Sequence, residues 1–138
     1  MIKVILDTNT IISGLGWEGS SQQIMNRFLN DEFKIVISPE ILKEVENVLF
    51  RDKFSFIDKS KKEEFILILS ELTEIVNPKL RLRICRDEND NKFLELAVES
   101  NANYIVSGDL DLLSIKEYNR IKILSSKDFL NILKKSKP

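Results

Sequence analysis

The chain contains no histidine and only one cysteine, Cys85, among its 138 residues. The missing histidine excludes Ser-His-Asp hydrolysis, Cys-His proteolysis and histidine-ligated zinc. A single cysteine excludes an intramolecular disulfide and a thiolate metal cluster, and it is typical of a protein in a reducing compartment. Metal chemistry in this chain would therefore depend on oxygen ligands.

The chain also lacks a strong net charge and a long apolar run. Twenty-one Lys and Arg residues against 22 Asp and Glu leave a net charge of −1, so any RNA contact would need a local basic patch. The apolar stretch from Ile2 to Leu6 is too short for a signal peptide, and no run approaches the length of a membrane span. We therefore expect a cytoplasmic protein without a membrane partner.

The composition is that of an ordinary globular domain, with 43% hydrophobic and 31% charged residues. A chain of this length buries a full core without disulfides, and it matches the commonest size of a single domain. The sequence shows no repeat, low-complexity tract or linker. We therefore predict one domain over residues 1–138.

Short β-prone runs alternate with amphipathic helical stripes along the chain. The patterns predict strands at 2–6, 34–37, 79–85, 104–107 and 121–124, a glycine-containing loop up to residue 19, and helices at about 20–30, 38–49, 59–75, from 90 and from 126. This alternation predicts an α/β fold, with a parallel sheet of about five strands and helices on both faces. Such folds bind ligands at the carboxyl ends of the strands.

Four acidic residues stand near the expected strand ends. Asp7 follows the first strand, Asp109 follows the fourth, and Glu44 and Asp90 lie in the helices after the second and third. Four carboxylates in one cleft repel one another, and a divalent cation resolves that conflict. Oxygen-only ligands suit Mg²⁺ or Mn²⁺, and one or two such ions activate water for attack on a phosphodiester. The sequence therefore indicates a metal-dependent phosphodiesterase.

Each acid also has an ordinary structural interpretation. Asp90 suits a helix N-cap, and Asp109 after Gly108 suits a turn. Glu44 borders the apolar stripe of its helix and suits the margin of an exposed face. Asp7 is harder to explain in this way, because it follows a buried strand. The coincidence of all four at strand-end positions favours the catalytic interpretation.

Four segments of the chain resemble PIN domains. These segments are Leu6-Asp7-Thr8-Asn9-Thr10-Ile11-Ile12-Ser13, Ile37-Ser38-Pro39-Glu40-Ile41-Leu42-Lys43-Glu44-Val45, 87–97 (Asp-Glu-Asn-Asp-Asn-Lys-Phe-Leu-Glu-Leu-Ala) and 103–113 (Asn-Tyr-Ile-Val-Ser-Gly-Asp-Leu-Asp-Leu-Leu). Their order, their spacing and the elements that flank them agree with the family, and together they span nearly the whole chain.

The resemblance implies a three-layer α/β/α fold with sheet order 3-2-1-4-5. It implies metal binding by Asp7, Glu44, Asp90 and Asp109, with assistance from Asp111 and support from Thr8, Asn9 and Ser107. Asp87 is a rival for Asp90, which is preferred because it stands seven residues before Ala97, the spacing of the family. With this sheet order, strands one and four become neighbours and bring Asp7 and Asp109 together.

Compact members of this kind resemble VapC-like toxins, which cleave RNA with Mg²⁺ or Mn²⁺ and are silenced by an antitoxin protein. The resemblance therefore implies a metal-dependent endoribonuclease and a homodimer. A non-catalytic RNA- or protein-binding module is the alternative, although degenerate members would be expected to have lost an acid. A phosphoacceptor or phosphatase domain fits less well, because no Lys directly follows the fourth strand. A DNA nuclease also fits less well, because nothing in this chain resembles the extra helical elements that clamp DNA in related nucleases.

Lys79, Arg81 and Arg83 alternate with apolar residues in the segment expected to form the edge strand. Their basic face is a candidate contact for an RNA backbone near Asp90. Edge strands also carry Lys and Arg to block edge-to-edge association, and this simpler interpretation is preferred.

Overall fold

A single mixed sheet organises the computed structural model, which describes residues 1–16 and 19–135. Its strands are β1 (Lys3–Leu6), β2 (Lys34–Ile37), β3 (Glu74–Ile75), β4 (Tyr104–Val106), β5 (Glu117–Tyr118) and β6 (Ile121–Leu124), in the order β3-β2-β1-β4-β6-β5. All neighbouring strands are parallel except β5, which pairs antiparallel with β6. The predicted order 3-2-1-4-5 is confirmed for the five parallel strands, and β5 is an addition.

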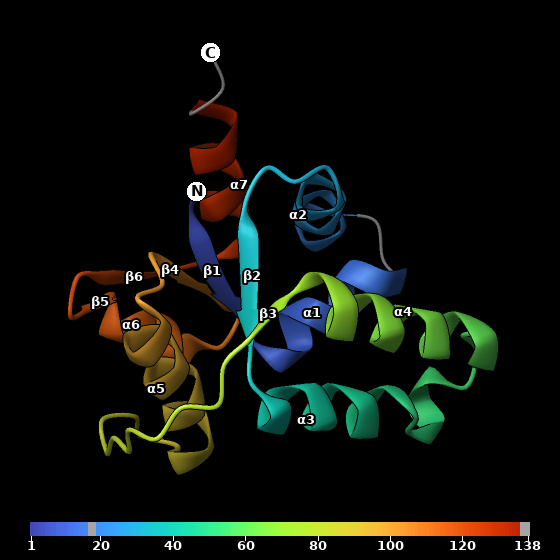
Figure 1. Ribbon diagram of the computed structural model, residues 1–138, viewed down its shortest axis with the longest axis horizontal. Coiled ribbons are helices and arrows are strands. Elements are labelled where there is room, and N and C mark those ends of the chain that lie inside the picture. The colour runs from blue at the N-terminus through green and yellow to red at the C-terminus, as the bar shows by residue number, and fades with distance from the viewer. Residues whose placement is uncertain (17–18, 136–138) are drawn as a thin grey trace.

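Helices flank this sheet (Figure 1). They are α1 (Thr8–Gly16), α2 (Ser20–Leu29), α3 (Pro39–Leu49), α4 (Lys59–Leu72), α5 (Asn91–Ser100), α6 (Leu110–Ile115) and α7 (Ser126–Lys135), with 3₁₀ turns η1 (Asp52–Phe54) and η2 (Glu88–Asp90). Val4, Ile5 and Leu6 are all buried, so helices cover both faces of β1 and the predicted α/β class is confirmed. No helix in the described ranges is long and apolar enough to cross a membrane.

Four aromatic rings join α2 and α7 to the sheet. Phe33, just before β2, lies 5.2 Å from Phe129 of α7 in an edge-to-face arrangement and 6.0 Å from Phe28 of α2. Phe129 also lies 5.7 Å from Tyr104 of β4, between ring centroids. Such pairs stabilise a core beyond the area they bury. This cluster fixes the amino ends of the strands, opposite the end that bears the acids.

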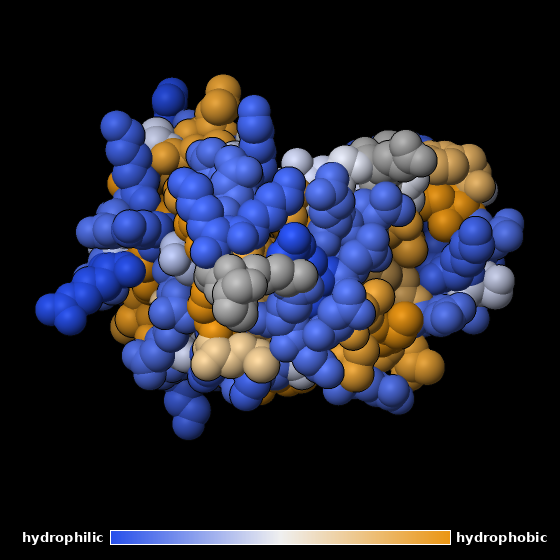
Figure 2. Space-filling view, turned by 90° about the horizontal axis from the view of Figure 1, so that it is seen from above, coloured by the Kyte–Doolittle hydropathy of each residue, from blue (hydrophilic) through white to orange (hydrophobic). Residues whose placement is uncertain are grey.

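The surface at that aromatic end has two characters. Figure 2 looks down on it, and hydrophilic side chains dominate the left of the view, whereas hydrophobic atoms gather on the right, the side of α2 and α4. Leu29 of α2 and Leu67 and Leu72 of α4 are each about half exposed.

The loop expected after Asp7 is instead helix α1. Its glycines caused the error, because glycine is read as a turn signal. A Cβ at Gly14 would lie 3.3 Å from both the Met25 side chain and the Ser21 carbonyl oxygen of α2. Gly14 therefore permits a close approach of two helices, and it does not mark a turn.

The edge strand expected at 79–85 is a second error. The third parallel strand is β3, and helix α4 ends before it at Leu72 instead of continuing to residue 75. Residues 79–85 form no strand pairing. The segment, which carries Lys79, Arg81 and Arg83, instead lies along α5. The interpretation of these cations as guards of a sheet edge therefore fails.

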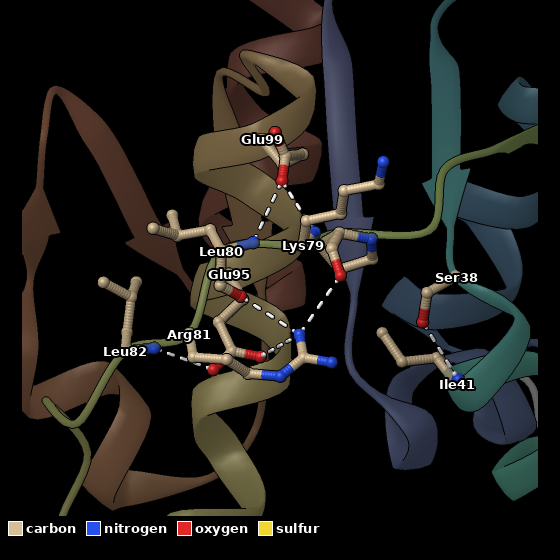
Figure 3. A network of polar contacts seen from close by, with 9 residues as sticks. Ser38, Ile41, Lys79, Leu80, Arg81, Leu82, Glu95 and Glu99 are labelled. Carbon is tan, nitrogen blue, oxygen red and sulfur yellow. Dashed lines mark hydrogen bonds and ion pairs between the residues drawn. The ribbon is translucent and has the colours of Figure 1, made fainter.

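Side chains of α5 replace the missing strand partner of residues 79–85 (Figure 3). Asn91, Glu95 and Glu99 are spaced four residues apart, so they share one face of the helix. They accept backbone N–H bonds from Ile84 and Cys85, from Leu82, and from Lys79 and Leu80, respectively. The two bonds to Glu99 hold the pKa of that carboxyl below its usual range. Residues 79–85 thus have the alternating sequence pattern of a strand, although side chains of α5, and not a neighbouring strand, accept their backbone N–H groups.

Glu95 is the buried carboxylate of this row, and we expect Glu95→Ala to loosen the segment. Glu95 accepts the Leu82 N–H at 2.8 Å and lies 3.7 Å from the Arg81 guanidinium. Removing it leaves a donor unpaired, which costs about 1–3 kcal/mol of unfolding free energy. Chemical denaturation and hydrogen exchange at Leu82 measure the change. Exposed Glu88, changed to Ala, is the control, and unchanged exchange at Leu82 in Glu95→Ala would contradict the role.

Candidate active site

Pairing of β1 with β4 brings the first and last predicted acids to one place. Leu6 and Val106 are partners in the parallel register, and the Asp7 N–H donates to the Val106 carbonyl oxygen at 3.1 Å. The next residue of that strand end, Ser107, donates its hydroxyl to Asp7 Oδ2. The expected proximity of these two strand ends is therefore present.

Asp7 is a buried carboxylate with both oxygens engaged. Its side chain is 6% exposed, and Oδ1 accepts the Thr10 N–H at 2.8 Å while Oδ2 accepts the Ser107 hydroxyl. The first of these bonds makes Asp7 the side-chain cap of α1. The positive end of the helix dipole favours a charge there. The site therefore begins from an acid that is held rigidly through both oxygens.

Asp109 and Asp90 form the second part of the site. Asp109 caps α6 through Oδ1, which accepts the Asp111 N–H at 3.1 Å, and its own N–H donates to Ser107 Oγ at 2.9 Å. The interpretation of Asp109 as a local turn residue is thus also correct for one of its oxygens. Its carboxyl hydrogen-bonds the side chain of Asp90. Two acids from β4 and α5 therefore meet directly.

Asp90 is the acid of the cleft whose pKa is raised by its surroundings. Burial, followed by the hydrogen bond to Asp109 and the charges of Asp109, Asp87 and Asp7, raises the pKa of Asp90 from 3.8 to about 7. Its Oδ2 is buried without a hydrogen-bond partner in the described part of the chain. Asp90 stands at the N-cap position of α5, as predicted, but its side chain makes no cap hydrogen bond, whereas Asp87 caps η2 by accepting the Asn89 N–H. The capping side chain here is thus that of Asp87.

Glu44 is held by two donors from other helices. Thr8 donates its hydroxyl to Oε1, and the Lys92 ammonium donates to Oε2. The helix of Glu44 carries no Lys or Arg on the same face within one turn, and the sequence analysis did not identify Lys92, which comes from α5. Its position two residues after Asp90 was the available signal, because it lies in the first turn of the helix that follows Asp90.

The four acids line one cleft of about 750 Å³. Thr8, Asn9 and Asp87 line it as well, and Arg51 and Lys53 supply positive charge that the sequence analysis did not identify. Ser107 lies buried beneath the cleft and holds Asp7. Asp111 lies outside the lining, with its side chain exposed and only its N–H on Asp109.

A second cleft of about 770 Å³ adjoins the first, because Asn89 and Lys92 line both. Arg81, Arg83 and Arg86 line it, whereas Lys79 does not. Among the described residues Arg83 and Arg86 form no ion pair.

Cys85 also lines the second cleft and lies near the acids. Burial, followed by the charges of Asp90, Asp109, Asp87 and Glu95, raises the pKa of its thiol to about 11. Only the thiolate is a good nucleophile or metal ligand. The Cys85 thiol is therefore held in its neutral form, which is a poor nucleophile and a poor metal ligand.

The donor set fits a hard divalent cation. In residues 1–16 and 19–135, no three Asp, Glu or Cys side chains are already arranged as a set of metal ligands. The geometry explains this, because Glu44 is turned to Lys92 while Asp90 and Asp109 share a hydrogen bond. A cation that replaced the shared proton would also satisfy Asp90 Oδ2. Oxygen donors of this kind suit Mg²⁺ or Mn²⁺.

Comparisons with known proteins agree with the fold. A family model described as PIN domain matches residues 3–111. An uncharacterized protein of Methanocaldococcus jannaschii is 31% identical over 145 residues, which cover 97% of this chain and 93% of that protein. The crystal structure of VapBC2 from Rickettsia felis bound to a DNA fragment from their promoter matches with a TM-score of 0.61 at 17% identity. That match covers 88% of this chain and 97% of the other, and it shows likeness of fold.

The pKa of Asp90 predicts a pH-dependent gain in stability for Asp90→Asn without metal. Between pH 3.8 and about pH 7 the folded carboxyl keeps a proton that the unfolded chain has lost. The folded state then binds more protons, so the wild-type free energy of unfolding falls as the pH rises through this window. Asparagine does not titrate, so Asp90→Asn should gain stability relative to wild type from about pH 5 to about pH 8.

Urea denaturation in EDTA across this pH range measures that difference. Glu88→Gln serves as the control, and its difference from wild type should stay constant. A constant difference for Asp90→Asn would show that the Asp90 pKa is not raised.

Proposed function

The chain belongs to the PIN-domain family, and from this membership we propose that it is a divalent-metal-dependent endoribonuclease that hydrolyses RNA phosphodiester bonds. The observation that supports the proposal best is the crowding of Asp7, Asp90 and Asp109 in one cleft. That crowding leaves Asp90 with a buried, unpartnered oxygen and a pKa of about 7. Sites of chemistry often hold groups whose pKa is raised by burial and by like charge.

In this proposal Asp7, Asp90 and Asp109 hold Mg²⁺ or Mn²⁺, and Glu44 completes the acidic wall. Such a cation supplies Lewis acidity that activates water and neutralises the phosphodiester. Asp7 contributes a fixed position, because Thr10 and Ser107 hold both of its oxygens. A bound cation would favour the deprotonated form of Asp90, whose pKa is raised to about 7 by burial and by its neighbours. The missing histidine is thereby accounted for, since no histidine base is needed.

The positive side chains around the acids suit a polyanionic substrate. Arg51 and Lys53 line the acid cleft, and Arg81, Arg83 and Arg86 line the adjoining one. A phosphate backbone is attracted by such side chains regardless of base sequence. An RNA strand that crosses both clefts would place one phosphate at the acids and its neighbours at the arginines.

The toxin role is part of the same proposal. The fold is like that of VapBC2, a complex of Rickettsia felis whose crystal structure contains a promoter DNA fragment. We infer that this chain is likewise the toxin of a toxin–antitoxin pair, with an antitoxin protein as partner and a homodimer as its assembly. A cytoplasmic location agrees with an RNA substrate and with a single cysteine, Cys85, whose thiol is neutral.

We expect purified protein to cleave RNA only with Mg²⁺ or Mn²⁺. Asp7→Asn should lower the rate by about 10²–10³-fold or more, the loss typical of one electrostatic group at a reacting centre. Cleavage of a pool of structured and unstructured RNAs measures the rate, with EDTA as one control and Asp128→Asn, on distant α7, as the other. The fold of Asp7→Asn is verified by circular dichroism.

Activity that survives EDTA or Asp7→Asn would point to a contaminating nuclease or to a different site. If no metal supports cleavage, titration of Mn²⁺ into wild type separates two cases. Metal binding without cleavage indicates a narrow RNA target. Absence of metal binding indicates a non-catalytic RNA- or protein-binding module.

The arginine-lined cleft predicts a separate effect on substrate binding. Arg83→Ala and Arg86→Ala should each raise KM several-fold with little change in kcat, and each should reduce the salt dependence of RNA affinity by about one phosphate contact. Arg81→Ala should act less, because Glu95 already engages Arg81. Steady-state kinetics and filter binding at several salt concentrations measure these changes.

Lys79→Ala is the matched control, since Lys79 belongs to the same segment but lies outside the cleft. An equal effect of Lys79→Ala would mean that RNA follows the whole 79–85 segment and that the cleft does not define its path.

A further inference from the structure

A lysine ammonium occupies the acid cleft. Lys92 lies in the first turn of α5, its side chain is only 12% exposed, and its Nζ donates to Glu44 Oε2. The same Nζ lies 5.4 Å from the centroid of the Phe93 ring, which adds a weak attraction at the base of the cleft. Because Lys92 lines both clefts, it stands where the acids adjoin the arginines. Its charge is therefore part of the acid site.

The position of Lys92 determines which acids remain available. Glu44 has its Oε1 on the Thr8 hydroxyl and its Oε2 on the ammonium, so both of its oxygens are engaged. Asp90 instead faces Asp109 and Asp7, whose charges act on it. The four acids thus divide into a group of three and a separate Glu44–Lys92 pair. A group of three suits a single cation.

A second divalent cation would have to displace the ammonium. Paired metal ions lie about 3.5–4 Å apart and need carboxylates that bridge both. Here the fourth carboxylate is held by a positive charge, which repels an incoming cation at short range. Among the ion pairs of the described residues, none joins Arg51 or Lys53, the other cations of the cleft, to Glu44, and Lys53 lies over the Phe54 ring at 5.1 Å.

We propose that Lys92 takes the place of a second divalent cation, so that the chain binds one metal ion at Asp7, Asp90 and Asp109. Lys92 is in this role a positioning residue, which pairs with Glu44 and repels a second cation by its charge. The inference rests on the proposed function, since it assumes that the acids bind a divalent cation. It adds the number of ions, which the family membership does not determine for this chain.

The test counts Mn²⁺ ions bound per chain by isothermal titration calorimetry and by electron paramagnetic resonance. Wild type is expected to bind one ion, with the spectrum of an isolated Mn²⁺. Lys92→Met retains an unbranched chain without the charge, and it is expected to bind two ions with a spin-coupled spectrum. Lys92→Arg restores a positive charge and should bind one. Lys53→Met, which removes a charge from the same cleft without touching Glu44, should also bind one.

Lys92→Gln provides a second route if Lys92→Met does not fold. The amide can still donate to Glu44 without carrying charge, so this variant should also bind two ions. Circular dichroism verifies the fold of each variant before titration. Two ions in wild type, or one ion in a folded Lys92→Met or Lys92→Gln, overturn the inference.

The RNA cleavage assay separates this failure from failure of the proposed function. Metal-dependent cleavage by a wild type that binds two ions overturns only the role of Lys92. The expected ion counts without cleavage of the RNA pool support the role of Lys92 and indicate a narrow RNA target. A wild type that binds no Mn²⁺ overturns both.

Discussion

Repulsion among carboxylates at the ends of β1 and β4 is the constraint around which this molecule is arranged. Burial, together with the hydrogen bond to Asp109 and the charges of the nearby acids, raises the pKa of Asp90 to about 7, and each neighbouring group relieves part of that repulsion. Ser107 and the first turn of α1 stabilise the charge of Asp7, and a hydrogen bond joins Asp90 to Asp109. The parallel pairing of β1 and β4 opposes the repulsion, because it fixes both strand ends whatever the charge between them.

The positions of the acids could be predicted because they depend on local rules. An acid directly after a buried parallel strand, as at Asp7, must lie at the carboxyl edge of the sheet. The pair Ser38-Pro39 is typical of a helix start and marks the predicted beginning of α3, where the Ser38 hydroxyl accepts the Ile41 N–H. The sheet order came from resemblance, and the pairing of β1 with β4 confirms it. Where residues adjacent in the sequence define the surroundings of a side chain, the sequence was sufficient to predict its position.

The remaining features depend on contacts between distant segments. Gly14 was read as a turn signal, although its role is to let α2 approach α1. The alternation at 79–85 was read as a strand, although the partner of that segment is a row of side chains on α5. Lys92 was overlooked, because the search considered cations on the helix of Glu44 and the pair bridges two helices. In each case the deciding neighbour lies far away or on another helix.

The row of acceptors on α5 has a consequence for how this protein can change. Asn91, Glu95 and Glu99 bind main-chain N–H groups of the adjoining segment and make little use of its side chains. Most residues at 79–85 are therefore free to vary, whereas insertion or deletion of one residue would shift every donor out of step with the helix. The cleft beside the acids can thus acquire a new lining, and with it a new preference among substrates, while its length and path stay the same.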